Sequence, residues 1–474
     1  MTEPKSSFAC SYNDVTAQNL DFYYLKLLDK IKPASFVALD FEFTGLCKAK
    51  TTDMNHRYVA LKEAIESHTI VSMGISVIQR KTKKSDLVRS TKTDLPLSQP
   101  QPQSQPQSDS PPQSQLYSLS QPQPSLDTVS PDTPSVSDNT EEEESQSYLT
   151  YECDNFDFLA LTDTDFSITE DTGQFLIDHG FSFDRLFQQG IRFTTPLEQS
   201  RQNAKDNRSL LAENKQKERL KLSNMWKTIT SIMKYNNIPL VVHNGLYDIM
   251  YLYHSFMDVL PNTLRGFENA ISERFPSGIY DTKHLVSQYG SEFTASFLTY
   301  LFNKCDRLRQ NSFTECEPSQ PYFEVAINQP ILPPIDNKSK IPKMESKGIK
   351  RKHHTEPDSH VSKQKITICK AYAERGYCPK EKQGDPLHHS KSPLHDIQLV
   401  LDREMGVSAY KQNYTSNPDD DTGGAHAAYY DAYMTAFVFC YLRLKIPLTH
   451  LHDNINKINI DSSMHPLRLP VPKK

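Results

Sequence analysis

The sequence lacks three patterns that would each define a class of protein. Its 8 cysteines are spread thinly over 474 residues, which indicates a reducing compartment rather than a disulfide scaffold. No run of roughly 18 apolar residues occurs, and the first residues form no apolar stretch suited to a signal peptide, so we expect no membrane span. The formal net charge of -5 argues against a surface coated with positive charge. Any nucleic acid must therefore be held by local patches or by stacking.

Proline and polar residues are abundant instead. The chain has 31 prolines and a mean hydropathy of -0.61, so much of it is not core, although its length suffices for two or three domains. Residues 85–147 are rich in Ser, Gln and Pro and predict a disordered insert within a domain, rather than a linker between two. Residues 307–365 predict a disordered basic linker. Its basic run, Lys350 to Lys352, is typical of a nuclear import signal, and a solvated linker is the alternative.

One apolar segment, FVALDFEFTGL from Phe36 to Leu46, carries two acids where a buried strand is expected. In a strand Asp40 and Glu42 point to the same face, with Cα atoms about 6.6 Å apart at about 3.3 Å per residue. The rest of both faces is apolar, which predicts a strand inside a sheet covered on both sides. Ionised groups are rarely buried without a partner or a metal. The segment therefore predicts a nearby cation.

Hydrophobic periodicity predicts an α/β fold around this strand. Helices are expected over 20–31 and 222–233 and a second strand over 69–79. The segment 238–256 predicts a strand, a His-Asn-Gly turn and a helix, which is a unit of an α/β sheet flanked by helices. The ranges that we expect are a nuclease core in three parts (10–84, 148–306 and 397–450), the two disordered inserts, a finger-like segment (366–396) and a C-terminal tail (451–474).

Two more acids are expected at the same sheet. Asp248 falls in the first turn of the helix that follows the His-Asn-Gly turn, where α/β sheets build their sites, and Asp431 lies on the inward stripe of a late helix. Each acid alone is weak evidence, since a helix N-terminal aspartate is usually a capping or dipole effect. Four carboxylates in one cavity need divalent metal, and oxygen ligands select Mg²⁺ or Mn²⁺. Two such ions about 3.5 to 4 Å apart would suit phosphoryl displacement.

His426 lies five residues before Asp431, which puts the two on different faces of a helix. We expect it on the loop entering that helix, where it could act as general base toward an attacking water. The alternative is a structural histidine. His243 in the His-Asn-Gly turn is expected only to hold the turn.

The segments LDFEFTGL, VVHNGLYDIMYLY and AHAAYYDAYMT resemble the three exonuclease motifs of the DEDDh ribonucleases, in the branch of the poly(A)-specific ribonucleases. FLIDHGFSFDRLFQQGI, ERFPSGIYDTKHL and FTASFLTYLFNKC are similar to one member of that branch. The resemblance implies that Asp40 and Glu42 fill the first motif, Asp248 the second, and His426 with Asp431 the third. Asp281, in IYDTK, is not one of the four ligands of that family, so we expect it behind them.

The resemblance further implies an RNase H-like exonuclease fold with a central mixed sheet and two Mg²⁺ or Mn²⁺ ions. The expected activity is 3′-to-5′ trimming of adenosine tails from single-stranded RNA, on small nuclear RNA precursors, with release of AMP. The expected location is the nucleus, in its Cajal bodies, nucleolus or speckles. Two rivals stay open: a related exonuclease acting on DNA or short oligonucleotides, and a noncatalytic RNA-binding adaptor.

A CCCH zinc finger precedes the third motif in the similar family member, and ICKAYAERGYCPKEKQGDPLHHSKSPLHDI occupies that place here. Cys369 and Cys378 keep the eight-residue gap of that finger, and His395 fits its terminal histidine, but the third cysteine is missing. His388 or His389 could complete a tetrahedral Cys₂His₂ zinc site. The alternative is a degenerate finger without metal. Tyr372 and Tyr377, with Lys370 and Arg375, would suit stacking on single-stranded RNA.

Overall fold

The computed structural model describes residues 10–47, 51, 53–81, 148–203, 210–314, 322–333, 368–382, 395–406, 426–461, 463 and 465–471. These residues all belong to one structural unit, formed by 1–81 together with 146–474. The predicted insert 85–147 lies outside the described residues, as does the basic run at 350–352. Among the described residues no helix combines the length and the apolar character needed to cross a bilayer.

A mixed sheet runs through this unit. Its described strands are β1 (Asn13–Val15), β2 (Phe36–Phe43), β3 (Ile70–Lys81), β4 (Tyr148–Thr162), β5 (Ile191–Phe193), β6 (Leu240–Val242), β7 (Ile279–Asp281), β8 (Tyr322–Ile327), β9 (Lys457–Ile458) and β10 (Leu467–Arg468). The order is β1-β4-β3-β2-β6-β7-β9-β10, and β5 and β8 also pair with β4. Strands β2, β3 and β4 are antiparallel neighbours, whereas β6 is parallel to β2 and β7 to β6. The acid-bearing strand β2 is therefore central.

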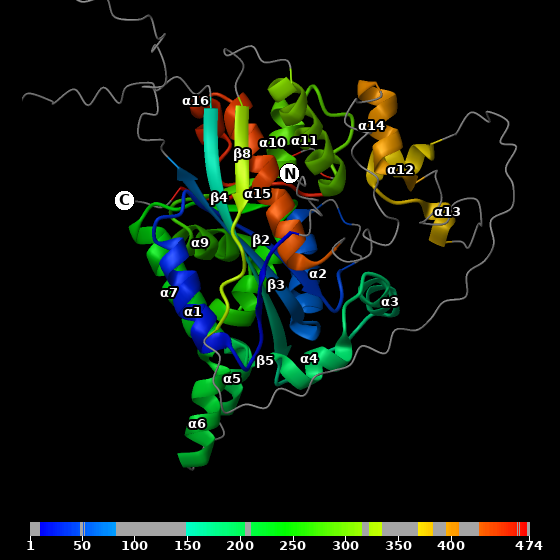
Figure 1. The fold of residues 1–474 in the computed structure, drawn as a ribbon. Helices are drawn as coiled ribbons and strands as arrows, with labels where there is room; N and C mark the ends of the chain where they lie inside the picture. Colours follow the sequence, from blue (N-terminus) through cyan, green and yellow to red (C-terminus); the bar gives the residue numbers. More distant parts are fainter. Residues whose placement is uncertain are drawn as a thin grey trace, which may run out of the picture. The chain divides into compact units, whose positions relative to one another are not determined.

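Helices cover both faces of the sheet (Figure 1). The described helices are α1 (Leu20–Ile31), α2 (Met54–Ser67), α3 (Glu170–Asp178), α4 (Phe183–Gln189), α5 (Pro196–Asn203), α6 (Leu210–Arg219), α7 (Lys221–Tyr235), α8 (Leu246–Leu252), the π-helical turn η1 (Tyr253–Met257), α9 (Leu264–Arg274), α10 (Thr282–Tyr289), α11 (Leu298–Thr314), α12 (Lys370–Arg375), α13 (Pro379–Lys382), α14 (Ile397–Met405), α15 (Ala428–Lys445) and α16 (Leu448–Asp453).

The alternation of side chains along β2 divides the core in two. Val37, Leu39 and Phe41 join one buried cluster with side chains of α1, α2, α7, α8 and α9. Phe36 and Ala38 join a second cluster on the opposite face with α10, α11, α14 and α15. Asp40 and Glu42 share the face of Phe36 and Ala38, so they point toward the layer that contains α15. The apolar residues of β2 thus hold the acids under that helix.

Several sequence predictions are confirmed. The structure has a mixed α/β sheet flanked by helices, with α1 at 20–31, β2 within 36–46 and β3 overlapping 69–79. The predicted strand–turn–helix unit is β6 followed by α8. The helix ends earlier than expected, since the π-helical turn η1 follows at Tyr253.

Two predicted boundaries are wrong. The linker expected over 307–365 begins too early, because α11 continues to Thr314 and β8 pairs in parallel with the first half of β4. Phe323 of β8 is buried in the second core cluster, and this burial accounts for a strand within a segment that is otherwise polar. The expected C-terminal tail is part of the sheet, because β9 pairs with β7 and β10 with β9. Ile458 and Leu467 bury themselves in the first core cluster there.

Candidate active site

Three of the predicted acids meet on the face of the sheet that packs against the second core cluster. One carboxylate oxygen from each of Asp40, Glu42 and Asp431 lies within 4.8 Å of the other two, and all three residues are partly buried. Two come from β2 and the third from the first turn of α15, which is more than 380 residues away in the sequence. Oxygens of this kind at this spacing are the donor set that Mg²⁺ or Mn²⁺ accepts.

A glycine lets α15 come this close to the sheet. Gly74 of β3 lies directly opposite Asp40 in the antiparallel pair. A Cβ atom at Gly74 would lie 1.9 Å from the backbone oxygen of Ala428, at the start of α15. Because no side chain intervenes, the first turn of the helix rests on the strand and places Asp431 above Asp40. Sequence reasoning missed Gly74, although a lone glycine inside an apolar strand is the signal of such a close approach.

Asp248 lies beside this group rather than within it. Its Oδ1 accepts a hydrogen bond of 3.0 Å from the backbone N–H of Phe41, the residue between the two strand acids. It belongs to the first turn of α8, as predicted, and is 8% exposed. The set of oxygens within 4.8 Å contains the other three acids only, among the described residues. The carboxylate of Asp248 is therefore held against β2 by a hydrogen bond from the backbone of that strand.

The electrostatics of the site follow from burial and from like charge. Burial raises the pKa of Asp40 well above its usual range, and the charges of Asp431 and Asp248 raise it further. The pKa of Glu42 is raised for the same reasons. Burial also raises the pKa of Asp248 to about 7, against the lowering effect of its backbone hydrogen bonds. In the absence of a cation, burial and like charge therefore favour the protonated forms of Asp40, Glu42 and Asp248.

The surroundings of one Asp431 oxygen indicate whether the carboxylate cluster suits a cation. Oδ1 of Asp431 is buried and has no hydrogen-bond partner among the described residues. Buried polar atoms are nearly always paired, and a buried carboxylate oxygen without a donor is costly. A hard divalent cation would satisfy this atom together with the oxygens of Asp40 and Glu42. The donor set therefore fits the predicted metal.

His426 stands at the edge of the cluster. Its Nδ1 lies 3.8 Å from Oδ2 of Asp431, and 43% of its side chain is exposed, compared with 14% for Asp431. The residue precedes α15 and has a φ of 63°, in the left-handed region, which turns the chain into the helix. An accessible imidazole next to a carboxylate cluster is suited to accept a proton from a water molecule at that site.

The turn that leads into α8 is held by Asp281, the acid expected behind the ligands. Its buried carboxylate accepts hydrogen bonds from five backbone N–H groups. They belong to Asn244 and Gly245 of the turn, Lys283 and His284 of α10, and Asn459 near the C-terminus. It also caps the N-terminus of α10. Asp281 thus joins three distant segments directly behind the helix that carries Asp248.

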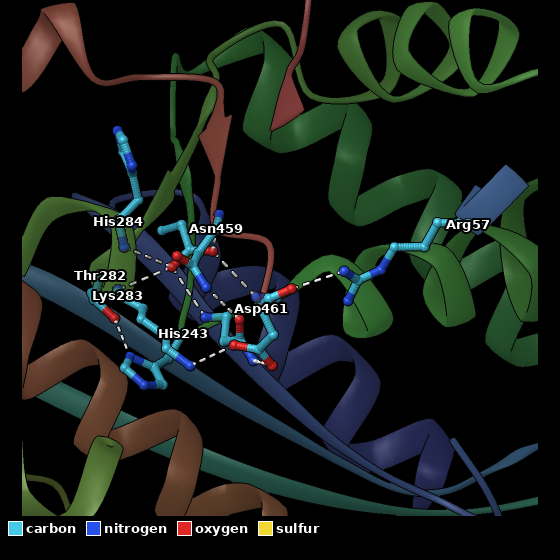
Figure 2. Close-up of polar contacts among 10 residues, drawn as sticks. Arg57, His243, Thr282, Lys283, His284, Asn459 and Asp461 are labelled. Atoms are coloured by element: carbon cyan, nitrogen blue, oxygen red, sulfur yellow. Dashed lines mark hydrogen bonds and ion pairs between the residues drawn. The ribbon is translucent and has the colours of Figure 1, made fainter. Parts of the chain in front are cut away.

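Further polar contacts hold that turn to neighbouring segments (Figure 2). Asp461 accepts hydrogen bonds from Lys283 Nζ at 2.8 Å and from Asn244 Nδ2 at 3.0 Å, and its backbone oxygen accepts one from Arg57 at 2.8 Å. His243 Nδ1 contacts the Thr282 hydroxyl at 2.9 Å. His243 therefore ties the turn to α10, in agreement with the structural role expected for it.

Sequence reasoning also missed a fifth acid. Asp157 of β4 pairs with Gly74, which pairs with Asp40, so the three lie in one row across the sheet. Ser72 donates a hydrogen bond of 2.6 Å to Asp157. Burial raises the pKa of Asp157 to about 6 even though this hydrogen bond lowers it. Only the register of the strands brings this acid to the site, and no spacing within the sequence could have identified it.

The cysteine and histidine segment forms a separate group of donors. The ligand atoms of Cys369, Cys378 and His395 lie within 4.8 Å of one another, the sulfurs are 3.6 Å apart, and all three residues are buried. His388 and His389, expected as the fourth ligand, lie outside the described residues. Tyr377 is 52% exposed, as a stacking ring would be.

Tyr372, the other ring expected to stack on RNA, is partly buried and packs against the second core cluster. It lies 5.1 Å from the ring of His395 and 6.3 Å from Phe297 between ring centroids. The reason is the position of α12 next to the loop before α11, which the sequence does not reveal. Of the two tyrosines, Tyr377 is therefore the more exposed.

Comparisons with known proteins bear on this geometry. A family model described as CAF1 family ribonuclease matches residues 15–439. Similar solved structures include the RNase domain of yeast Pop2 (TM-score 0.34, covering 64% of this chain and 78% of that chain) and the Mg²⁺- and Mn²⁺-bound form of S. pombe Pop2p (TM-score 0.36, covering 63% and 83%). Both are 13% identical to this chain.

Proposed function

Since the chain belongs to the CAF1 family of ribonucleases, we propose that it is a metal-dependent 3′-to-5′ exoribonuclease that trims adenosine tails from RNA. The observation that carries this proposal is the convergence of Asp40, Glu42 and Asp431, with a buried Asp431 oxygen that has no partner among the described residues. An RNA-cleaving family and a site for hard cations support the same chemistry.

In the proposed reaction the acids would hold two Mg²⁺ or Mn²⁺ ions. Asp40, Glu42 and Asp431 supply the oxygens that already lie together, and Asp248 adds its carboxylate from α8. Bound ions of this kind stabilise both the attacking and the leaving oxygen of an in-line displacement at phosphorus. His426 takes the proton of the attacking water. The leaving group is the 3′ oxygen of the shortened RNA, and the product is AMP.

The finer assignment within the family rests on motif resemblance. We propose that the chain is similar in function to the Target of early growth response deadenylase, because FLIDHGFSFDRLFQQGI and ERFPSGIYDTKHL resemble segments of that protein. That assignment favours small nuclear RNA precursors as substrates and a nuclear location, in Cajal bodies, nucleolus or speckles. The basic run Lys350 to Lys352 supports nuclear import, and expressing the full chain with and without this run checks it by microscopy.

Digestion of end-labelled RNA tests the activity. Purified protein with Mg²⁺ is incubated with RNAs that differ only in their 3′ tails, one of adenosines and one of mixed sequence. We expect a ladder that shortens from the 3′ end, faster on the adenosine tail, with AMP as the product. Internal cleavage products, or equal digestion of a DNA of the same sequence, would contradict the proposal and support the rival exonuclease. Binding without cleavage would support the adaptor.

Metal binding is expected to depend on pH in a defined direction. The raised pKa of Asp40, Glu42 and Asp248 means that the metal-free fold binds protons more tightly than the unfolded chain. Their contribution to stability is therefore present at acidic pH and is lost as the pH rises through about 7, the value for Asp248. A metal must displace these protons at low pH but not at high pH.

We therefore expect Mn²⁺ to raise the Tm of chelator-treated protein more at pH 8 than at pH 5.5, measured by differential scanning fluorimetry. Buried histidines such as His254, whose pKa burial lowers to about 4, act in the opposite direction but cancel from the difference with and without metal. A Mn²⁺ effect of equal size at both pH values would contradict the carboxylate site.

We also propose that Cys369, Cys378 and His395 bind one zinc ion. Three buried donors within 4.8 Å support this, since thiolate and imidazole are the ligands that zinc prefers. The fourth ligand is His388 or His389. Zinc content of the purified chain, measured by mass spectrometry, should fall from about one per chain to none when Cys369 and Cys378 are both replaced by serine. Equal zinc in both proteins would contradict the site.

A further inference from the structure

His426, the proposed general base, is not fixed by its own helix. Its Nδ1 lies 3.8 Å from the nearest Asp431 oxygen, which is too long for a hydrogen bond. The residue stands before the first turn of α15, and nearly half of its side chain is exposed. A catalytic base has to be held within a narrow range of positions. Some other element must therefore limit the motion of this ring.

Two rings of another segment contact it. The ring of His179 lies 4.4 Å from the His426 ring, centroid to centroid, at an interplanar angle of 83°. The Phe175 ring lies 5.2 Å away at 62°. Both are edge-to-face arrangements, which are the favoured geometries of aromatic pairs. His426 is thus in contact with two rings that come from α3 and from the residue that ends it.

The two rings support each other. Phe175 and His179 are one helical turn apart and their centroids are 4.2 Å apart. Nδ1 of His179 lies 2.7 Å from the Phe175 backbone oxygen. A carbonyl oxygen only accepts hydrogen bonds, so Nδ1 carries the proton. Burial lowers the pKa of His179, although its hydrogen bond to the Phe175 carbonyl acts in the opposite direction.

α3 is connected to the strand that bears the acids. The backbone N–H of Thr169, the N-cap of α3, donates a hydrogen bond of 3.0 Å to the oxygen of Thr44, two residues after Glu42. Leu176 anchors the helix in a small buried cluster with Val71 of β3. These two contacts tie the helix to the sheet, so they set the position of its rings relative to the carboxylates.

From this geometry we propose that His179 is a positioning residue, which with Phe175 holds the imidazole of His426 over the carboxylate cluster. The inference rests on the proposed function, because it assigns a task within that reaction. His179 contacts the base and not the acids, so it acts through His426. Its loss should slow the chemical step and leave the binding of RNA unchanged.

Single-turnover kinetics on adenosine-tailed RNA with Mg²⁺ test the proposal. We expect His179→Ala to lower the rate at saturating enzyme by about 10- to 100-fold, with the half-saturating concentration unchanged. His179→Phe keeps an aromatic ring at this place and should restore most of the rate. Ile177→Ala is the matched control, because Ile177 is 55% exposed on the same helix and has no part in the ring contacts. Its rate should equal that of the parent.

A double-mutant cycle separates positioning from structural damage. In a His426→Ala background, His179→Ala should cause no further loss, because its effect passes through the missing ring. An unchanged rate in His179→Ala, an equal loss in Ile177→Ala, or an additive loss in the double variant would each overturn the inference. A raised half-saturating concentration at an unchanged rate would also overturn it, since His179 would then contact RNA. Absence of cleavage by the parent would overturn the proposed function itself.

Discussion

Replacing Asp40 and Glu42 together with alanine is expected to lower RNA cleavage by at least about 10³-fold. Metal ions supply several kcal/mol of transition-state stabilisation, and each 1.36 kcal/mol is worth about tenfold in rate. The two substitutions remove two of the three oxygens that lie within 4.8 Å. The measurement is the single-turnover rate on adenosine-tailed RNA.

The same double variant is expected to remain folded. Without metal, burial disfavours the ionised forms of both side chains, and those forms repel Asp431 and Asp248, so their removal should leave the Tm of chelator-treated protein unchanged or raise it. The matched control removes one aspartate and one glutamate from exposed helix positions, as Asp29→Ala with Glu63→Ala. Its cleavage rate should equal that of the parent. Retained cleavage in the Asp40 and Glu42 double variant, or its unfolding, would contradict the metal site.

Replacing Asp281 with alanine is expected to lower the free energy of unfolding by about 4 kcal/mol or more. The substitution leaves buried backbone N–H groups without an acceptor, and each costs about 1 to 3 kcal/mol. It also removes the N-cap of α10, worth about 1 kcal/mol. Urea denaturation followed by circular dichroism measures the loss.

Asp53 provides the control for this prediction. It caps α2 by accepting from His56 N–H at 2.9 Å, but it is exposed and joins no distant segments. Asp53→Ala should therefore cost only about 1 kcal/mol. If Asp281→Ala costs no more than Asp53→Ala, Asp281 is an ordinary cap and not the junction behind α8.

Since that junction fixes the turn before Asp248, Asp281→Asn should also weaken metal binding.

The sequence predicted those parts of the fold whose signal is local. β2 was found because apolar residues on both faces predict a central strand, and α1 because Leu20, Leu27 and Ile31 recur at helical spacing. β8 and β9 were missed because short strands are stabilised by the neighbours to which they pair. Phe323 and Ile458 are buried by residues distant in sequence, and no local sequence pattern indicates their burial.

The chemistry of the acids was determined by the sequence alone. Asp40 and Glu42 could be recognised because a strand apolar on both faces cannot bury two carboxylates without compensation. The tertiary structure decided which oxygens share a cation, which rings hold His426, and that Asp157 borders the site. The physical reason is that composition and spacing fix which groups are costly to bury. The distances between groups hundreds of residues apart are fixed only where distant segments pack together, as the start of α15 packs on Gly74.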